Sequence, residues 1–181
     1  MLARGVSRRR GGLRASRWMF IGLLVWLFST RFVGAATQLP VDKPLRFGTD
    51  KSVELFAKLT RHRVYYLDIA FPFRDAQERA YMSRIVGEPT RICKLSGECG
   101  VPTAFIVTVK KGEDLVLREE KRVFGRYAFD VKRYYRNIIT IQLKPGSYTI
   151  TVEPTENGNE IADLEALIEL STDARATDLK D

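Results

Sequence analysis

Apolar and polar side chains alternate along much of this chain, which is the pattern of β-strands with one buried face. The pattern is clearest over residues 138–152, where two runs rich in β-branched residues flank Pro145 and Gly146. In the second run, side chains from Tyr148 to Val152 fall alternately on two faces. Since a Pro-Gly pair favours a tight turn, the sequence predicts a β-hairpin at the centre of an antiparallel sheet.

The rest of the alternation predicts further short strands separated by turn residues, over residues 45–47, 53–59, 64–71, 103–109, 115–117 with 123–124, and 127–131. A helix is expected over 76–86, because Asp75 and Glu78 form a capping box and Gly87 follows the last turn. Residues 164–170 suit a helix by propensity, but their alternation favours a closing strand, which we prefer. The predicted fold is mainly β, an antiparallel β-sandwich of about seven to nine strands with one inserted short helix.

The N-terminus has the pattern of a secretory signal peptide. Residues 1–17 contain six arginines and no acidic residue, and an apolar run from Trp18 to Phe28 follows. Small residues at Val33 and Ala35 predict cleavage after Ala35, with Ala36 as the alternative site. The other interpretation, an uncleaved inner-membrane anchor, is disfavoured because the apolar run is well short of the ~20 residues that span a bilayer. We expect a periplasmic or secreted bacterial protein that meets the membrane only through this segment.

The expected organisation is a signal peptide over 1–35, a single β-sandwich domain over 37–172 and a flexible tail over 173–181. The net charge of +8 comes mainly from the first segment, since residues 1–36 hold seven basic and no acidic residues. The remainder has 23 basic against 22 acidic residues, close to neutrality. Such a balance argues against a nucleic-acid partner, which a strongly basic domain would suggest.

The two cysteines, Cys93 and Cys99, both lie in the part expected to be exported. An even number of cysteines this close together in an oxidising compartment predicts a disulfide. The alternatives are free thiols or a metal site, but structural zinc requires four ligands and the only histidine is His62, far away in sequence. We expect no metal and no cofactor.

Catalytic motifs are absent from the sequence. It contains no nucleophile elbow, zincin helix, glycine-rich phosphate loop or EF-hand pattern. His62 lies in a run of arginines without a nearby nucleophile, which indicates a solvated turn residue. Glu119 and Glu120 belong to a mixed-charge run typical of an exposed face. We therefore predict no catalytic residues and no enzymatic activity.

One segment combines basic and aromatic side chains more densely than a single buried strand face would need. Arginine and tyrosine together can hold an anionic glycan or an acidic protein loop through cation–π contacts and charge-assisted hydrogen bonds. The candidate binding residues are Arg126, Lys132, Arg133, Tyr134, Tyr135 and Arg136. We expect Arg133, Arg136 and one of the two adjacent tyrosines to be exposed together. The alternative is an ordinary strand with Tyr127 and Phe129 in the core.

Four segments resemble a domain family of unknown function that occurs in small exported proteins and lipoproteins of proteobacteria: residues 61–67, 84–87, 101–102 and 143–152. Their most specific piece is the Leu-x-Pro-Gly-x-Tyr sequence from Leu143 to Tyr148. The resemblance implies an exported compartment and a β-rich fold, and it brings no catalytic residues. Unlike the lipoproteins, this chain has no cysteine near the expected cleavage site.

Two functions remain open from the sequence. The first is a non-catalytic cell-envelope binding module whose partner is a protein or an anionic polymer, such as the inhibitor or immunity partner of another protein. The second is an envelope hydrolase whose site is assembled from residues far apart in sequence. The single histidine and the absence of a nucleophile motif favour the first.

Overall fold

The computed structural model describes residues 39–156 and 160–172, and the expected signal peptide and tail lie outside these ranges. Within them the chain forms nine strands and two helices. In chain order these elements are β1 (Val41–Arg46), β2 (Val53–Leu59), β3 (Arg63–Pro72), α2 (Ala76–Val86), α3 (Thr90–Ser96), β4 (Thr103–Lys111), β5 (Asp114–Val123), β6 (Ala128–Phe129), β7 (Arg133–Leu143), β8 (Gly146–Glu156) and β9 (Glu165–Ser171). No helix among the described residues is long and apolar enough to cross a membrane.

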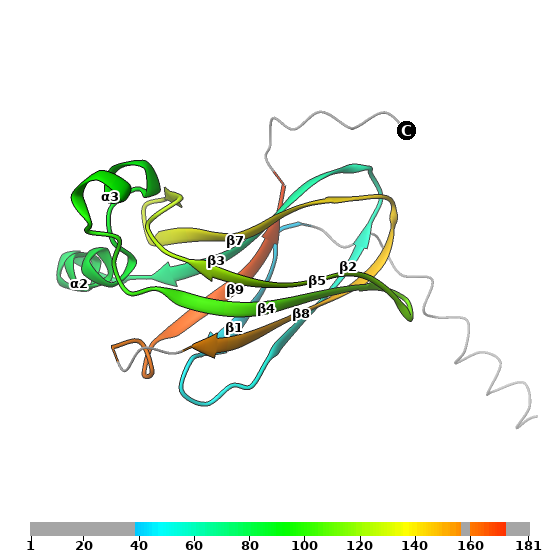
Figure 1. Ribbon diagram of the computed structural model, residues 1–181, viewed down its shortest axis with the longest axis horizontal. Helices are drawn as coiled ribbons and strands as arrows, with labels where there is room; N and C mark the ends of the chain where they lie inside the picture. The colour runs from blue at the N-terminus through cyan, green and yellow to red at the C-terminus, as the bar shows by residue number, and fades with distance from the viewer. Residues whose placement is uncertain (1–38, 157–159, 173–181) are drawn as a thin grey trace, which may run out of the picture. The chain divides into compact units, whose positions relative to one another are not determined.

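The strands form two antiparallel sheets, as the alternation predicts (Figure 1). One sheet has the order β1-β9-β3-β7-β6 and the other has the order β2-β8-β4-β5. The preferred strand over 164–170 is confirmed as β9, which pairs with β1 and with β3. The expected fold class, an antiparallel β-sandwich with an inserted helix, is therefore confirmed.

The expected hairpin over 138–152 is wrong. β7 and β8 belong to different sheets, so the Pro145–Gly146 turn carries the chain from one sheet to the other. Alternation correctly indicates which side chains are buried, such as Ile141 on β7 and Ile150 on β8, but two such faces can oppose each other across a core as well as lie side by side. Here they oppose each other.

In each of two connections between the sheets, a tyrosine hydroxyl makes a hydrogen bond that stabilises the turn. Tyr148 donates to the carbonyl of Lys144 (2.9 Å) after β7, and Tyr65 donates to the carbonyl of Arg61 (2.8 Å) after β2. Both rings are buried, and both hydroxyls reach a carbonyl four residues upstream. This arrangement resembles the tyrosine corner that fixes sheet-to-sheet crossings in other β-sandwiches.

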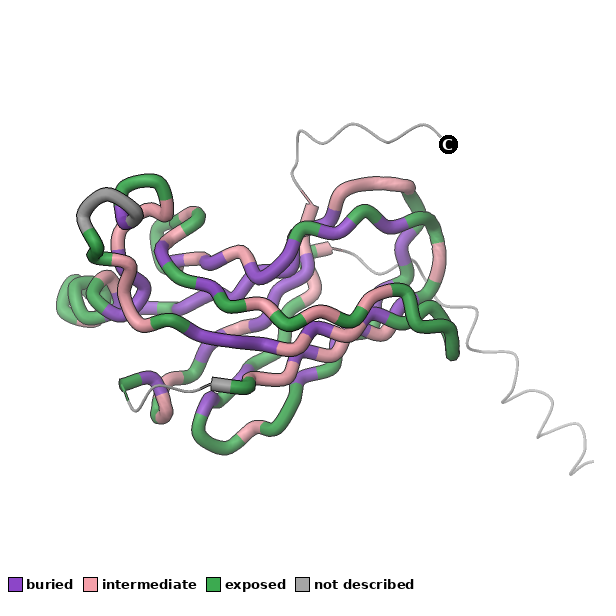
Figure 2. Tube along the Cα trace, viewed as in Figure 1, coloured by how far each residue is buried: buried purple, intermediate pink, exposed green. Residues whose placement is uncertain are grey.

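The core lies between the two sheets, where the inward faces of the long strands other than β5 are buried (Figure 2). Phe47, Phe71 and Phe105 pack together in it, with ring centroids 6.4 Å apart for the first two and 6.2 Å apart for Phe47 and Phe105. β5 carries mainly exposed or half-buried side chains. Its run of charged residues suits an edge strand that must not pair with other chains.

The helical insertion between β3 and β4 covers one end of the sandwich (Figure 1). α2 begins as predicted, because the Asp75 side chain accepts from the N–H groups of Gln77 and Glu78. α2 ends at Gly87, whose φ of 81° is readily adopted by glycine. α3 is a second short helix in the insertion, where the sequence predicts only one. Pro89 precedes its first turn, and the Cys93 carbonyl accepts from Gly97 N–H at its last.

The Cys93–Cys99 disulfide is present, with the two Cα atoms 4.7 Å apart. It closes α3 onto the segment that supports the β5–β6 connection, because the Cys99 carbonyl accepts from Gly125 N–H (2.9 Å). A disulfide agrees with an oxidising compartment.

We expect both cysteines to resist alkylation in the native, unreduced protein. Replacing Cys93 and Cys99 with serine should lower the free energy of unfolding by about 2 kcal/mol, because the closed loop is short. Urea titrations of the double variant and of wild type, each with and without reductant, measure this. Reductant should lower the free energy of unfolding of wild type but not that of the double variant. Labelling of either cysteine without reductant would contradict the prediction.

Candidate binding cleft

The basic and aromatic segment over 126–136 runs from the β5–β6 connection through β6 into β7. The structure does not gather its candidate residues into one exposed patch. Lys132 is exposed and Arg133 and Tyr135 are half-buried, whereas Tyr134 and Arg136 are 4% and 1% exposed.

The expectation that Arg136 is exposed is wrong. Its guanidinium donates to the carbonyls of Val101 (2.6 Å), Ile85 (2.7 Å) and Val86 (2.9 Å), and it lies 5.5 Å from the ring of Phe71. Ile85 and Val86 end α2, where the carbonyls at the negative end of a helix dipole attract a cation. Burial lowers the pKa of Arg136 to about 10, so the group remains charged at neutral pH. Arg136 therefore fastens the helix to β7.

Tyr134 is also structural. Its ring lies 5.0 Å from that of Phe73, the guanidinium of Arg126 lies 4.8 Å from its centroid, and Arg79 donates to its hydroxyl (3.3 Å). Phe129 is 63% exposed, so the alternative in which it belongs to the core is wrong as well. The same holds for Tyr127, which is 56% exposed.

The turn between β6 and β7, here called the Asp130 turn (residues 130–133), is held by one carboxylate. Asp130 accepts from the N–H groups of Lys132 and Arg133 (both 2.7 Å) and from the hydroxyl of Tyr135 (2.8 Å). Its own N–H donates to the Arg133 carbonyl (2.9 Å). Partial burial raises the pKa of Asp130, but these hydrogen bonds outweigh it and bring the pKa below its ordinary value. The carboxylate is therefore charged at neutral pH and the turn is fixed.

The Asp130 turn forms one wall of a large open cleft with a volume of about 1180 Å³. The other walls come from the end of β3, from α2 and from the beginning of β9. The β3–β9 pairing ends beside the cleft, at Ala70 and Leu167, and Pro72 has no N–H to continue it. The lining residues are Pro72, Phe73, Arg74, Glu78, Tyr81, Met82, Asp130, Val131, Lys132, Arg133, Leu164, Glu165 and Leu167.

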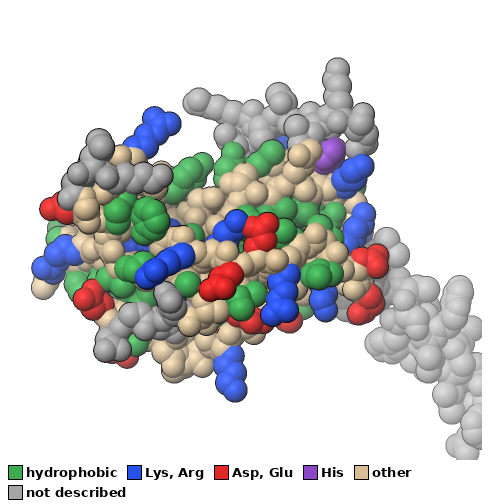
Figure 3. Space-filling model, viewed as in Figure 1, with side chains coloured by type: hydrophobic (Ala, Val, Ile, Leu, Met, Phe, Trp, Pro, Cys, Tyr) green, Lys and Arg blue, Asp and Glu red, His purple; other side chains and the backbone are tan. Residues whose placement is uncertain are grey.

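Seven of the thirteen lining residues are apolar and six are charged. Val131, at the tip of the Asp130 turn, is 88% exposed, more than any other exposed large hydrophobic side chain among the described residues. On the face seen in Figure 3, in contrast, basic and acidic side chains are interspersed without an extended patch of one sign. The cleft thus combines an exposed apolar side chain at its rim with the partly or fully buried apolar residues of its walls.

A buried acidic pair lies behind the cleft on the outer face of the five-stranded sheet. Asp68 on β3 and Glu169 on β9 are directly opposite in register, and they are 6% and 8% exposed. Burial raises the pKa of Asp68 to about 6. The hydrogen bond that Asn137 donates (2.8 Å) acts to lower this pKa, whereas the charge of Glu169 raises it further. Burial also raises the pKa of Glu169, although Arg133 (3.2 Å) opposes this.

Residues 42–172 match the family described as Domain of unknown function (DUF5625). The chain belongs to the DUF5625 family. The expected membership of a family of unknown function is thereby confirmed. Comparison of this DUF5625 domain with the curated proteins gave no match.

The fold of this DUF5625 domain is similar to the crystal structure of GEBA250068378 from Sulfurospirillum deleyianum. The TM-score is 0.62 at 17% sequence identity, and the alignment covers 77% of this chain and 100% of the other. At that identity the likeness concerns the fold alone.

Of the candidate binding residues of the DUF5625 domain, only Lys132 and Arg133 line the cleft. Sequence reasoning missed its apolar walls, including Phe73, Val131 and Leu164, since these come from four separate segments. Among the described residues, no three histidine, cysteine or acidic side chains are placed to hold a metal ion.

Proposed function

We propose that this DUF5625 domain is a non-catalytic, exported cell-envelope module that binds a polypeptide partner in the cleft. The observation that carries the proposal is the cleft itself, whose lining combines seven apolar and six charged residues, including the 88% exposed Val131. An apolar centre within a polar rim is the usual composition of protein interfaces. An inhibitor or immunity partner of another protein would have a surface of this kind.

Export is part of the proposal. The disulfide supports it, because such bonds persist in oxidising compartments. The basic and apolar N-terminal sequence supports it independently. Near-neutral charge after residue 36 favours a protein partner over a nucleic acid.

One observation favours the alternative, an envelope hydrolase. A carboxyl group whose pKa is about 6, as at Asp68, beside a second carboxyl group resembles the acid of a glycosidase pair. However, Asp68 is only 6% exposed and its Oδ1 accepts from Asn137. A catalytic acid must reach its substrate, so we favour binding.

Val131→Asp should weaken peptide binding about tenfold or more, because it places a charge on the exposed apolar tip of the cleft. The probes are peptides selected from a displayed random dodecapeptide library with the exported wild-type protein as bait. Fluorescence anisotropy with the selected peptides measures the affinities of wild type and variant.

The matched control is Val116→Asp, since Val116 is also exposed (47%) but lies on β5, away from the cleft. It should bind like wild type, and both variants should keep the wild-type melting temperature. Failure to select any peptide, or equal losses in both variants, would overturn the proposal. Mass spectrometry of the recovered peptides should find them intact; cleaved peptides would favour the hydrolase.

A further inference from the structure

The charged side chains of the cleft leave one cation unneutralised. Arg74 is paired with Glu78, and Arg133 is paired with Asp130 and Glu169 at 3.2 Å. These pairs occupy two of the three basic residues of the cleft.

The three acidic residues of the cleft are also engaged, since Glu165 faces Arg46 at 3.9 Å while Glu78 and Asp130 hold the arginines named above. Within residues 39–156 and 160–172, no acidic group contacts the Lys132 ammonium, although the Lys132 N–H is fixed by Asp130. The cleft therefore presents one available positive charge.

The Asp130 turn places this charge in a fixed position next to an exposed apolar side chain. Val131 and Lys132 are consecutive, and the hydrogen bonds to Asp130 hold the backbone on both sides of them. A turn ordered before binding loses little conformational entropy on binding, so its contacts contribute more to affinity and specificity.

We propose that the cleft selects an acidic polypeptide segment, in which an apolar side chain packs against Val131 and a neighbouring carboxylate pairs with Lys132. This inference rests on the proposed function and adds the chemistry of the partner. A carboxylate is complementary to the one available cation, and an apolar side chain is complementary to the exposed valine. A basic segment would instead meet Lys132 with like charge and find every acidic group of the cleft already paired.

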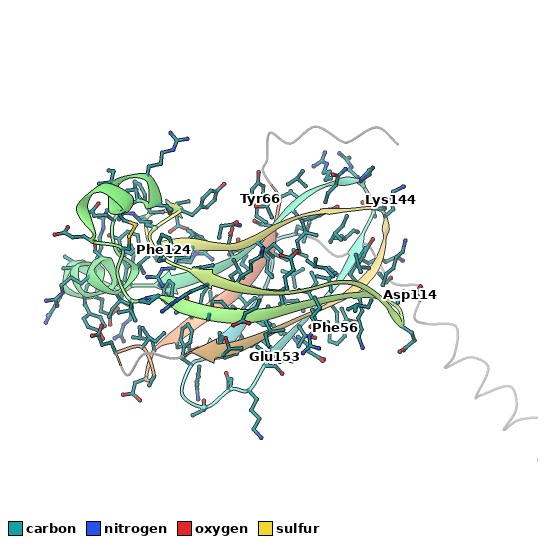
Figure 4. The ribbon with its side chains drawn as sticks, in the orientation of Figure 1. Phe56, Tyr66, Asp114, Phe124, Lys144 and Glu153 are labelled. Carbon is teal, nitrogen blue, oxygen red and sulfur yellow. A yellow bond between two sulfur atoms is a disulfide. The ribbon has the colours of Figure 1, made fainter. Side chains whose placement is uncertain are left out.

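A charge reversal at Lys132 tests the inference. Random dodecapeptides are selected in parallel against the exported wild-type protein, Lys132→Glu and Lys144→Glu. Lys144 is the matched control because it also lies in a connection between strands, at the end of the sandwich away from the helices (Figure 4). Wild type and Lys144→Glu should enrich peptides with an acidic residue next to an apolar one, and Lys132→Glu should enrich a basic residue at that position.

Synthetic peptides from the wild-type selection should bind Lys132→Glu about tenfold more weakly than wild type, because the attraction between Lys132 and a carboxylate becomes a repulsion. High salt screens these charges and should reduce the difference in affinity between the two proteins. If peptides still bind in a Val131-dependent manner but all three proteins select the same sequences, the inference fails while the proposed function stands. If Val131→Asp does not weaken binding, the proposed function itself fails. Displacement of the peptides by micromolar palmitate would identify the occupant as a lipid and overturn the inference.

Discussion

Replacing Arg136 with methionine should lower the free energy of unfolding by about 2 kcal/mol or more, because each carbonyl left without a donor costs roughly 1–3 kcal/mol. Arg136 is 1% exposed and donates to three carbonyls. The Ile85 carbonyl also accepts from Val101 N–H (2.8 Å) and keeps that donor, so the carbonyls of Val86 and Val101 are the ones that lose their donor. Methionine fills a similar volume and removes the cost of desolvating the charge, so the loss should remain below the sum of the three contacts. Urea titration followed by circular dichroism measures the change.

The matched control for this prediction is Arg118→Met on β5, whose arginine is exposed. It should change the free energy of unfolding by under ~0.5 kcal/mol. Hydrogen exchange adds a second measurement, since amides of α2 should lose protection in Arg136→Met before those of the core strands do. Equal stabilities of the two variants would contradict the assigned role of Arg136.

The stability of the protein should rise as the pH falls from neutral towards about pH 4. The pKa of Asp68 is about 6 in the folded protein against an ordinary value of 3.8, so the folded state binds this proton more tightly than the unfolded state. The resulting stabilisation is fully present below the unfolded pKa and is lost as the pH rises through the folded pKa. A difference of this size corresponds to about 3 kcal/mol of destabilisation at neutral pH, most of which should be recovered by about pH 4.

Asp68→Asn should remove most of this dependence and stabilise the protein at neutral pH by about 2–3 kcal/mol, since its amide oxygen can still accept from Asn137. The control is Asp114→Asn, whose aspartate is exposed at the β4–β5 turn and should behave as wild type. A smaller pH dependence of the same sign should persist through Glu169. Urea titrations across the pH range measure the free energy of unfolding of each protein. If this free energy changes with pH in Asp68→Asn as steeply as in wild type, the prediction is refuted.

The fold class could be predicted because burial follows from alternation, and alternation is a local property of the sequence. The position of a strand in the assembly is not local, which explains the error over 138–152. Burial along β7 was also hard to predict, because the pairing of β3 with β7 shifts register. Leu67 pairs with Ile139, but the next residue, Asp68, pairs with Asn137. This shift reverses the alternation within β7, so that Tyr134 and Arg136 face inward together with Ile139.

The candidate site was harder to predict, for two physical reasons. A lone arginine in a strand suggests a wet surface, and only the tertiary structure shows that the Arg136 side chain reaches the carbonyl end of a helix. The cleft joins residues from β3, α2, the Asp130 turn and β9, which are brought together by the sheet order rather than by spacing. Lys132 and Arg133 were identified because their basic character is visible without the fold.

The first and last residues of the described domain lie close together. Leu39 and Thr172 line one small pocket with residues of the β2–β3 connection, at which β3 begins. β3 then runs to Pro72 at the cleft, and its ten residues span roughly 30 Å at about 3.3 Å per residue. A linker, fluorescent protein or solid support attached before Leu39 or after Thr172 would therefore point the cleft outward, so either terminus is a suitable point of immobilisation.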